Sequence, residues 1–177
     1  MEDNAETTTE KSSGGVIKYA LLLGVLVAGC NSDLATKRMV SAELDRGETV
    51  ELVSGYLELK HTHNDAAAFS LLQQIDPDVR RPLLIAAQST ASLVLCILIV
   101  LWRRKSIGEL LPYLLVLSGA LGNVIDRIRY GHVVDFIHFH VGDRFSWPIF
   151  NVADILIAVG VGLILLRLLR QRSAEPI

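Results

Sequence analysis

Cysteine is scarce in this chain, and so is any excess of charge of one sign. Cys30 and Cys96 are the only two cysteines among 177 residues, and both lie inside apolar runs. The sequence therefore does not indicate a disulfide framework, and neither thiol has a histidine nearby in the sequence, as a cysteine protease would suggest. The 17 basic residues are balanced by 19 acidic ones, which argues against a nucleic-acid-binding protein with its clustered basic face.

Long apolar runs are what the sequence does contain. Hydrophobic residues make up 51% of the chain and charged residues only 20%. Most of the apolar residues fall in four stretches, each close to the ~20 residues that a helix needs to cross ~30 Å of hydrocarbon. The predicted spans are about 16–34, 83–102, 108–126 and 148–169. This pattern excludes an ordinary soluble enzyme and predicts an all-α membrane protein with four transmembrane helices.

The segments outside the four spans are short and polar. Residues 1–15 are polar and acidic, and such a composition predicts a disordered tail because little apolar surface is available for burial. Residues 173–177 form a short C-terminal tail, so the membrane domain is expected over 16–172. The sequence shows no internal repeat within this domain.

Lysine and arginine predict the orientation in the membrane. Basic residues lie in or beside the N-terminal tail, in the short connection at Arg103–Lys105 and at the C-terminus. Since such residues favour the cytoplasmic side, both termini are expected in the cytoplasm. Arg80 and Arg81, on the other side, count against this orientation.

Two extracytoplasmic segments, about 35–81 and 130–147, remain between the spans. In the first, residues 50–52 and 57–60 alternate apolar and polar side chains around Ser54-Gly55, which predicts a hairpin. The second alternates in the same way. Because open sheet edges are not tolerated in hydrocarbon, we expect a small extracytoplasmic β element at the membrane interface.

Ionisable residues inside or beside the spans are candidates for a functional site. Asn151 and Asp154 in the fourth span are three residues apart, while Asn123 and Arg127 in the third are four apart, so each pair is expected to share a helix face. Asp135 stands among large apolar neighbours at the same predicted membrane face. Two carboxylates brought together share one proton, because like charge raises the pKa of one of them. Such a pair hydrolyses amides by general acid–base catalysis without a metal or a nucleophilic side chain.

Other interpretations of these residues remain open at this point. Spacing does not say which two of Asp126, Asp135 and Asp154 meet, and each could pair with an arginine only to hold the bundle together. Asp126 is expected to be structural, paired with Arg127 or Arg129. Intramembrane acids also suit a small proton-coupled transporter, although the inverted repeats or paired broken helices of such proteins are not visible.

Two further patterns suggest functions that we consider weaker. Val27-Ala28-Gly29-Cys30 has the form of a lipobox, but a lipoprotein would continue as a soluble domain, so Cys30 is interpreted as a helix-packing thiol. The histidine pairs His61/His63 and His138/His140 have spacings that metal ligands use on strands. Without a His-Glu-x-x-His helix or paired cysteines, no metal and no cofactor is expected.

Five short motifs, in order from the first span to the fourth, resemble those of the lipoprotein signal peptidases (signal peptidase II). They are Asp33-Leu34-Ala35-Thr36-Lys37, Asn64 with Ala66-Ala67-Ala68-Phe69-Ser70, Gly122-Asn123 through Asp126-Arg127 to Gly131, Val134-Asp135-Phe136, and Phe150-Asn151-Val152-Ala153-Asp154. The resemblance covers nearly all of the chain except the tail. Asp65 departs from it, since the family usually has glycine after the asparagine.

The resemblance implies a membrane-embedded aspartic endopeptidase with Asp135 and Asp154 as the catalytic pair. It further implies substrate-binding or orienting roles for Asp33, Lys37, Asn64, Asn123, Arg127 and Asn151. The implied substrates are diacylglyceryl-modified bacterial prolipoproteins, cleaved before the lipidated cysteine. The protein is expected as a monomer in the bacterial cytoplasmic membrane, with its active site near the extracytoplasmic face and no nucleic-acid partner.

Overall fold

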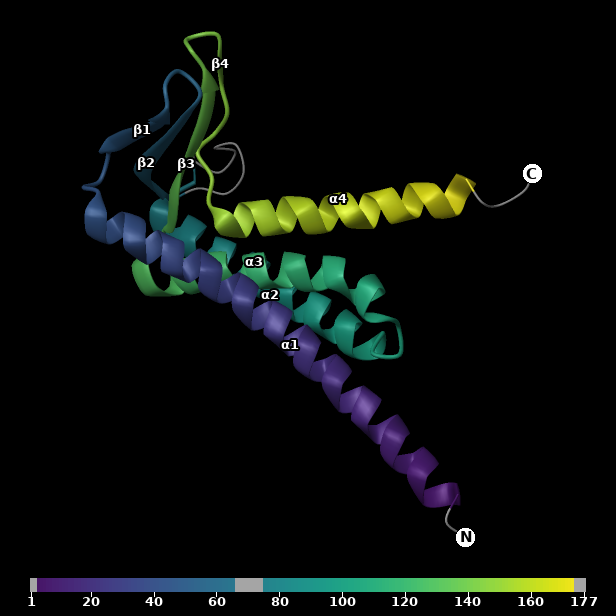
Figure 1. The fold of residues 1–177 in the computed structure, drawn as a ribbon. Helices are drawn as coiled ribbons and strands as arrows, with labels where there is room; N and C mark the ends of the chain where they lie inside the picture. Colours follow the sequence, from purple (N-terminus) through teal and green to yellow (C-terminus); the bar gives the residue numbers. More distant parts are fainter. Residues whose placement is uncertain (1–2, 66–74, 174–177) are drawn as a thin grey trace.

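Four long helices and a small sheet make up the protein (Figure 1). The structure, a computed structural model, describes residues 3–65 and 75–173. The helices are α1 (Asp3–Glu43), α2 (Pro77–Leu101), α3 (Ile107–Tyr130) and α4 (Val152–Ser173). Each contains a segment long and apolar enough to cross a membrane, which confirms the prediction of four spans.

The first helix is longer than the predicted span at both ends. Residues 3–15, which we expected to be disordered, continue the helix in the structure, and residues 174–177 of the predicted C-terminal tail lie outside the described residues. At the other end α1 continues past Leu34 to Glu43. An i,i+4 ion pair from Asp33 to Lys37 and the Thr36 hydroxyl, which donates to the Ser32 carbonyl, both support helix here.

Helix α3 lies at the centre of the bundle and contacts the other three helices. About half of its spanning segment is buried, whereas those of α1, α2 and α4 are mostly exposed, as expected for helices that face lipid. Two glycines let neighbours approach α3 closely. A Cβ at Gly119 would overlap the backbone of Ala153 in α4, and a Cβ at Gly122 would overlap the carboxylate of Asp33 in α1.

The sheet has four antiparallel strands in the order β1-β2-β3-β4. They are β1 (Thr49–Val53), β2 (Leu57–Asn64), β3 (Val133–Val141) and β4 (Phe145–Ser146). Strands β1 and β2 form the predicted hairpin, with Gly55 at a positive φ of 74° in the turn. Gly131 ends α3 in the left-handed conformation, which lets the chain turn directly from α3 into β3.

The sheet lies at one end of the bundle, where α1 ends and α4 begins, while both termini and the α2–α3 turn lie toward the other end (Figure 1). The Phe150 carbonyl accepts hydrogen bonds from the backbone N–H groups of Phe136 and Ile137. The chain entering α4 is therefore tied to β3. This connection brings Asp135 of the sheet next to the first turn of α4.

Candidate active site

Asp135 is held at its place on β3 by two amide side chains. Its side chain is almost completely buried, with the residue 2% exposed. The Asn151 Nδ2 donates to Asp135 Oδ1 at 2.6 Å, and the Asn64 Nδ2 donates to Oδ2 at 2.7 Å. Because strand β2 pairs with β3, Asn64 at the end of β2 lies beside Asp135. Both carboxylate oxygens thus have a donor that fixes their orientation.

Asp154 lies in the first turn of α4, closer to the N-terminus of the helix than expected. We predicted a span from about 148, which would place Asp154 deeper, but α4 begins at Val152. Asn151 caps it: its Oδ1 accepts from the Asp154 N–H at 3.0 Å, and Asp154 Oδ2 accepts from the Asn151 N–H at 3.1 Å. This reciprocal pair is the arrangement of a capping box. The three-residue spacing therefore also has a structural role.

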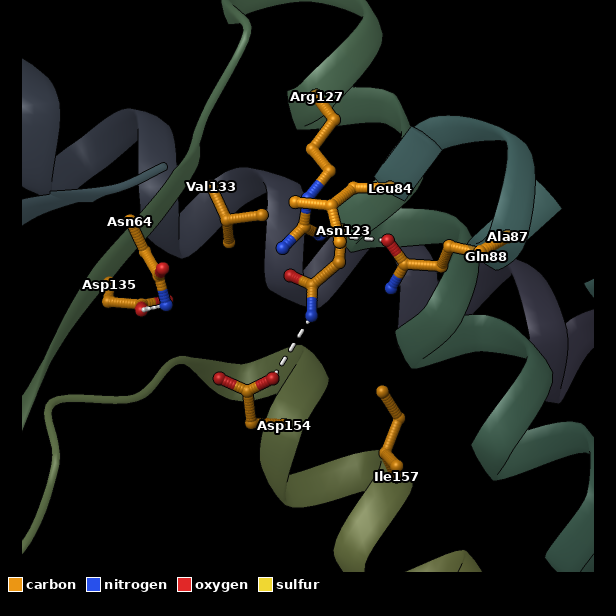
Figure 2. Close-up of a pocket in the computed structure, with 10 residues that line it drawn as sticks. All are labelled: Asn64, Leu84, Ala87, Gln88, Asn123, Arg127, Val133, Asp135, Asp154 and Ile157. Atoms are coloured by element: carbon orange, nitrogen blue, oxygen red, sulfur yellow. Dashed lines mark hydrogen bonds between the residues drawn. The ribbon is translucent and has the colours of Figure 1, made fainter. Parts of the chain in front are cut away.

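Both aspartates line the same cavity, of about 380 Å³. Figure 2 shows Asp135 reaching it from β3 and Asp154 from α4, with Asn123 donating to Asp154 across the space between α3 and α4. The remaining lining residues are Asn64, Leu84, Ala87, Gln88, Arg127, Val133 and Ile157. Six of the ten lining residues are polar or charged, and the volume lies within the range of ligand-binding pockets.

Asn151 contacts both carboxylates and so fixes their relative position. Its side chain donates to Asp135 and its backbone N–H donates to Asp154. Sequence spacing alone did not decide which two of Asp126, Asp135 and Asp154 lie together. In the structure, Asp135 and Asp154 do. Both carboxylates are therefore held beside the same cavity.

The environment of Asp135 favours its protonated form. Burial raises the pKa of the Asp135 carboxyl from 3.8 to about 6, and the negative charge of Asp154 adds to the rise. The hydrogen bonds from Asn64 and Asn151 oppose it, because they stabilise the carboxylate. A carboxyl group with a pKa near 6 exchanges its proton readily at neutral pH, as general acid–base catalysis requires.

A buried charge cluster supports the site from behind. Lys37 Nζ lies 2.7 Å from Asp33 Oδ2, 2.9 Å from Asp126 Oδ2 and 2.9 Å from Asn123 Oδ1. Asp33 also accepts from the Ala153 N–H at 2.8 Å, which connects α1 to the first turn of α4. Neither Asp33 nor Lys37 lines the cavity of the two aspartates. Their contacts place them as supports of Asn123 and α4.

The prediction that Asp126 pairs with an arginine was wrong. We predicted Arg127 or Arg129, but Asp126 forms its ion pair with Lys37 of α1. The reason is geometric: Asp126 lies on the side of α3 that faces α1, whereas Arg127, the next residue along the helix, lines the cavity. Residues adjacent in a helix do not face one another. The structural role expected for Asp126 agrees with its burial.

Gln88 of α2 is a cavity residue that the sequence reasoning missed. Its Oε1 accepts from the Arg127 Nη1 at 2.8 Å, and both residues line the cavity (Figure 2). Arg127 is 7% exposed, so this contact helps to orient a buried guanidinium. A glutamine inside an otherwise apolar span is costly in hydrocarbon, and this signal could have identified it.

The two histidine pairs lie on β2 and β3, and none of their side chains lines the cavity of the two aspartates. His138 Nδ1 lies 2.6 Å from Glu58 Oε1, and its Nε2 lies 2.8 Å from the Ser146 hydroxyl. Within residues 3–65 and 75–173, no group of three His, Cys, Asp or Glu side chains is arranged to hold a metal ion. Cys30 of the lipobox-like sequence lies within α1, partly buried.

The family model of signal peptidase (SPase) II matches residues 25–170 of the chain, a range that includes every one of these site residues. The chain belongs to the signal peptidase II family. It is 38% identical over 162 residues to the lipoprotein signal peptidase of Nitratidesulfovibrio vulgaris (strain DP4), covering 90% of this chain and 95% of that one. It is also 38% identical over 159 residues to the lipoprotein signal peptidase of Azoarcus sp. (strain BH72), with 88% and 85% covered.

Solved structures agree with this assignment. A bacterial membrane enzyme determined by the in meso method at 2.3 Å resolution superposes with a TM-score of 0.70 and 26% identity, covering 89% of this chain and 94% of that one. As a signal peptidase II family member with four spans, the protein is a multi-pass bacterial membrane peptidase. A transporter is not supported.

The position where this signal peptidase II departs from the family pattern does not disturb the aspartate pair. Asp65 is exposed directly after β2, and Asn64 keeps its hydrogen bond to Asp135. The motif residues 66–70 lie outside the described residues.

Proposed function

We propose that this signal peptidase II is an aspartic endopeptidase in which Asp135 and Asp154 share one proton. Its substrates are diacylglyceryl-modified prolipoproteins, cut immediately before the lipidated cysteine. The proposal is carried by one observation: both carboxylates line a single cavity and Asn151 holds them together. The substrate class follows the name of the relatives, which are lipoprotein signal peptidases.

The chemistry needs only these two groups and a water molecule. The ionised carboxylate takes a proton from water as the water oxygen attacks the scissile carbonyl carbon, while the protonated carboxyl donates to the carbonyl oxygen. Collapse of the tetrahedral intermediate breaks the C–N bond; the amine leaves with the proton of the protonated carboxyl, and a hydroxyl group of the intermediate gives its proton to the ionised carboxylate. The two carboxyl groups finish with one proton between them, as they began.

The surrounding residues position the pair and the substrate. Asn64, Asn151 and Asn123 donate to the two carboxylates, which leaves the oxygens oriented before substrate arrives. Arg127, held by Gln88, presents a guanidinium to the cavity, where it would bind the substrate backbone. Asp33 and Lys37 act through Asn123 and the first turn of α4.

The location of the site suits a substrate anchored by lipid. The cavity lies where the spanning helices meet the sheet, and we propose that this end of the bundle faces the extracytoplasmic side. The diacylglycerol would remain in the bilayer beside the exposed helices α2 and α4, while water enters from the sheet end. The scissile bond next to the modified cysteine then lies near the membrane surface.

Cleavage of a purified substrate tests the proposal. Wild-type protein in detergent should convert a diacylglyceryl prolipoprotein to its mature form, whereas Asp135→Asn and Asp154→Asn should each lower the rate by about 10²–10⁴-fold or more. Asp143→Asn, in the exposed β3–β4 turn, is the matched control and should cleave at the wild-type rate. Cleavage that persists in both variants would refute the aspartic mechanism.

A further inference from the structure

A second cavity, of about 400 Å³, lies on the other side of β3 from the aspartate pair. Consecutive residues of a strand point to opposite faces, and here Val133 lines the first cavity while Val134 lines the second. The two cavities have no lining residue in common. The second is therefore a separate feature, formed by the sheet-side ends of α1 and α3 together with β2 and β3.

The charge at this cavity is positive. Lys37 and Asp126 line it, and there Lys37 is shared between Asp126 and Asp33 in the buried charge cluster. Arg38 and Arg129 also line it, and both are exposed. Among the residues that the structure describes, neither of these arginines forms an ion pair with an acidic side chain. Two guanidinium groups thus remain for an anion, and their planar donors match phosphate oxygens.

The rest of the wall is apolar or uncharged. Leu34 and Val134 contribute aliphatic surface. The rings of His63 and His132 stack with their centroids 3.7 Å apart, and burial lowers the pKa of both, which keeps them neutral. An occupant that satisfies both parts of the cavity has an anionic head and an apolar body.

The position in the membrane points to the source of such a molecule. Arg129 lies in the last turn of the spanning segment Ile107–Tyr130, and Arg38 lies five residues before the end of the spanning segment Gly15–Glu43. Tyr130, which also lines the cavity, is 53% exposed, and tyrosine is enriched where hydrocarbon meets headgroups. Basic residues close to the membrane surface attract the headgroups of anionic lipids.

We propose that this second cavity binds one anionic phospholipid, with its phosphodiester on Arg38 and Arg129 and an acyl chain against Leu34 and Val134. The site is separate from peptide cleavage, and binding is measured without a substrate. Failure of this proposal therefore leaves the proposed peptidase activity untouched, and the reverse also holds.

Native mass spectrometry of the delipidated full-length protein in detergent tests the site. Dioleoylphosphatidylglycerol should bind at least tenfold more tightly than dioleoylphosphatidylcholine, which has the same chains but no net charge. The double variant Arg38→Gln/Arg129→Gln should lose this preference, because each charge-assisted contact contributes about tenfold. Arg103→Gln/Arg104→Gln removes two exposed arginines from the opposite end of the bundle and should keep the preference. A preference retained in the first double variant, or lost equally in both, overturns the proposal.

Two further arms separate the lipid from a free anion. Glycerophosphoglycerol supplies the same phosphodiester head without the chains and should bind at least tenfold more weakly than phosphatidylglycerol; equal binding would mean a site for a soluble phosphate compound instead. Ala42→Trp fills the cavity while both arginines remain, and it should weaken phosphatidylglycerol binding at least tenfold. Ala42, Arg38 and Arg129 are all exposed, so the variants should keep the unfolding temperature of the wild type within a few degrees. Full binding by Ala42→Trp would contradict the assignment of this cavity.

Discussion

At the scale of single residues, amide side chains organise this site. Asn64, Asn123 and Asn151 each donate to one of the two carboxylates, and Asn151 contacts both. An amide donor orients a carboxylate without adding a positive charge. Burial and the charge of Asp154 raise the pKa of Asp135, whereas the hydrogen bonds from Asn64 and Asn151 and the charge of Lys37 lower it.

Asn64→Leu should move the alkaline limb of the pH–rate profile to higher pH. The Asn64 amide lowers the pKa of Asp135, so its removal should let Asp135 keep its proton to a higher pH than in the wild type. The measurement is kcat/KM for prolipoprotein cleavage against pH. Asn31→Leu, an exposed asparagine on α1, is the control and should leave the limb in place. If the alkaline limb of Asn64→Leu keeps its wild-type position or moves to lower pH, this account of Asp135 is contradicted.

Lys37→Met should destabilise the protein by about 3–5 kcal/mol, because it leaves two buried carboxylates without their cation. Asp33, Asp126 and Lys37 are 0%, 1% and 3% exposed, so water does not replace the lost partner. Denaturant unfolding in detergent measures the change in the free energy of unfolding. Arg38→Met removes an exposed basic residue of the same helix, next to Lys37 in the sequence, and should cost less than about 1 kcal/mol. Equal stability of the two variants would show that the cluster is not an essential support.

At the scale of helices and strands, close approach between α1, α3 and α4 positions the pair. Gly122 allows the Asp33 carboxylate to lie against α3, from where it accepts the Ala153 N–H of α4. Asp154 follows Ala153 directly. The position of the Asp154 carboxylate therefore depends on a glycine in a different helix.

Gly122→Ala should reduce both stability and cleavage. The added methyl group would displace Asp33, and overpacking of this kind costs about 1–3 kcal/mol. We expect cleavage to fall at least tenfold, since small displacements of catalytic groups have large effects on rate. Gly24→Ala, where nothing lies within 4 Å of the new Cβ, should retain wild-type activity and stability. Both alanine variants are compared in the same cleavage and unfolding assays. Equal activity and stability of the two would contradict the role given to Gly122.

The elements were largely predictable from the sequence, and their contacts were not. Apolar length predicts four spans, and alternation predicts the hairpin of β1 and β2, because these are local properties. The start of α4 at Val152 depended on the cap formed by Asn151, which hydropathy does not register. The ion pair of Asp126 depends on which face of α3 meets α1. The contact of Gln88 with Arg127 depends on how α2 packs against α3. Such pairings between distant segments have no signal in one sequence.

At the scale of the whole molecule, exposed helix surface and the aspartate pair occupy different parts of the fold. The spanning segments of α1, α2 and α4 are mostly exposed around α3, whereas β3 and the first turn of α4, which carry the two aspartates, lie at the end of the bundle that has the sheet (Figure 1). Burial there raises the pKa of Asp135 to about 6. Burial of this sheet residue thus moves the pKa of one carboxyl group toward neutral pH.

The pH dependence of kcat/KM for the wild-type protein tests the shared proton most directly. Below the first apparent pKa both carboxyl groups are protonated and no base remains; above the second both are ionised and no acid remains. Because Asp135 has a raised pKa of about 6, we predict a bell whose alkaline limb falls near that pH, with both apparent values belonging to the pair. A rate that rises with pH and stays on a plateau to pH 9 would show that ionised carboxylates alone suffice, and would contradict the account.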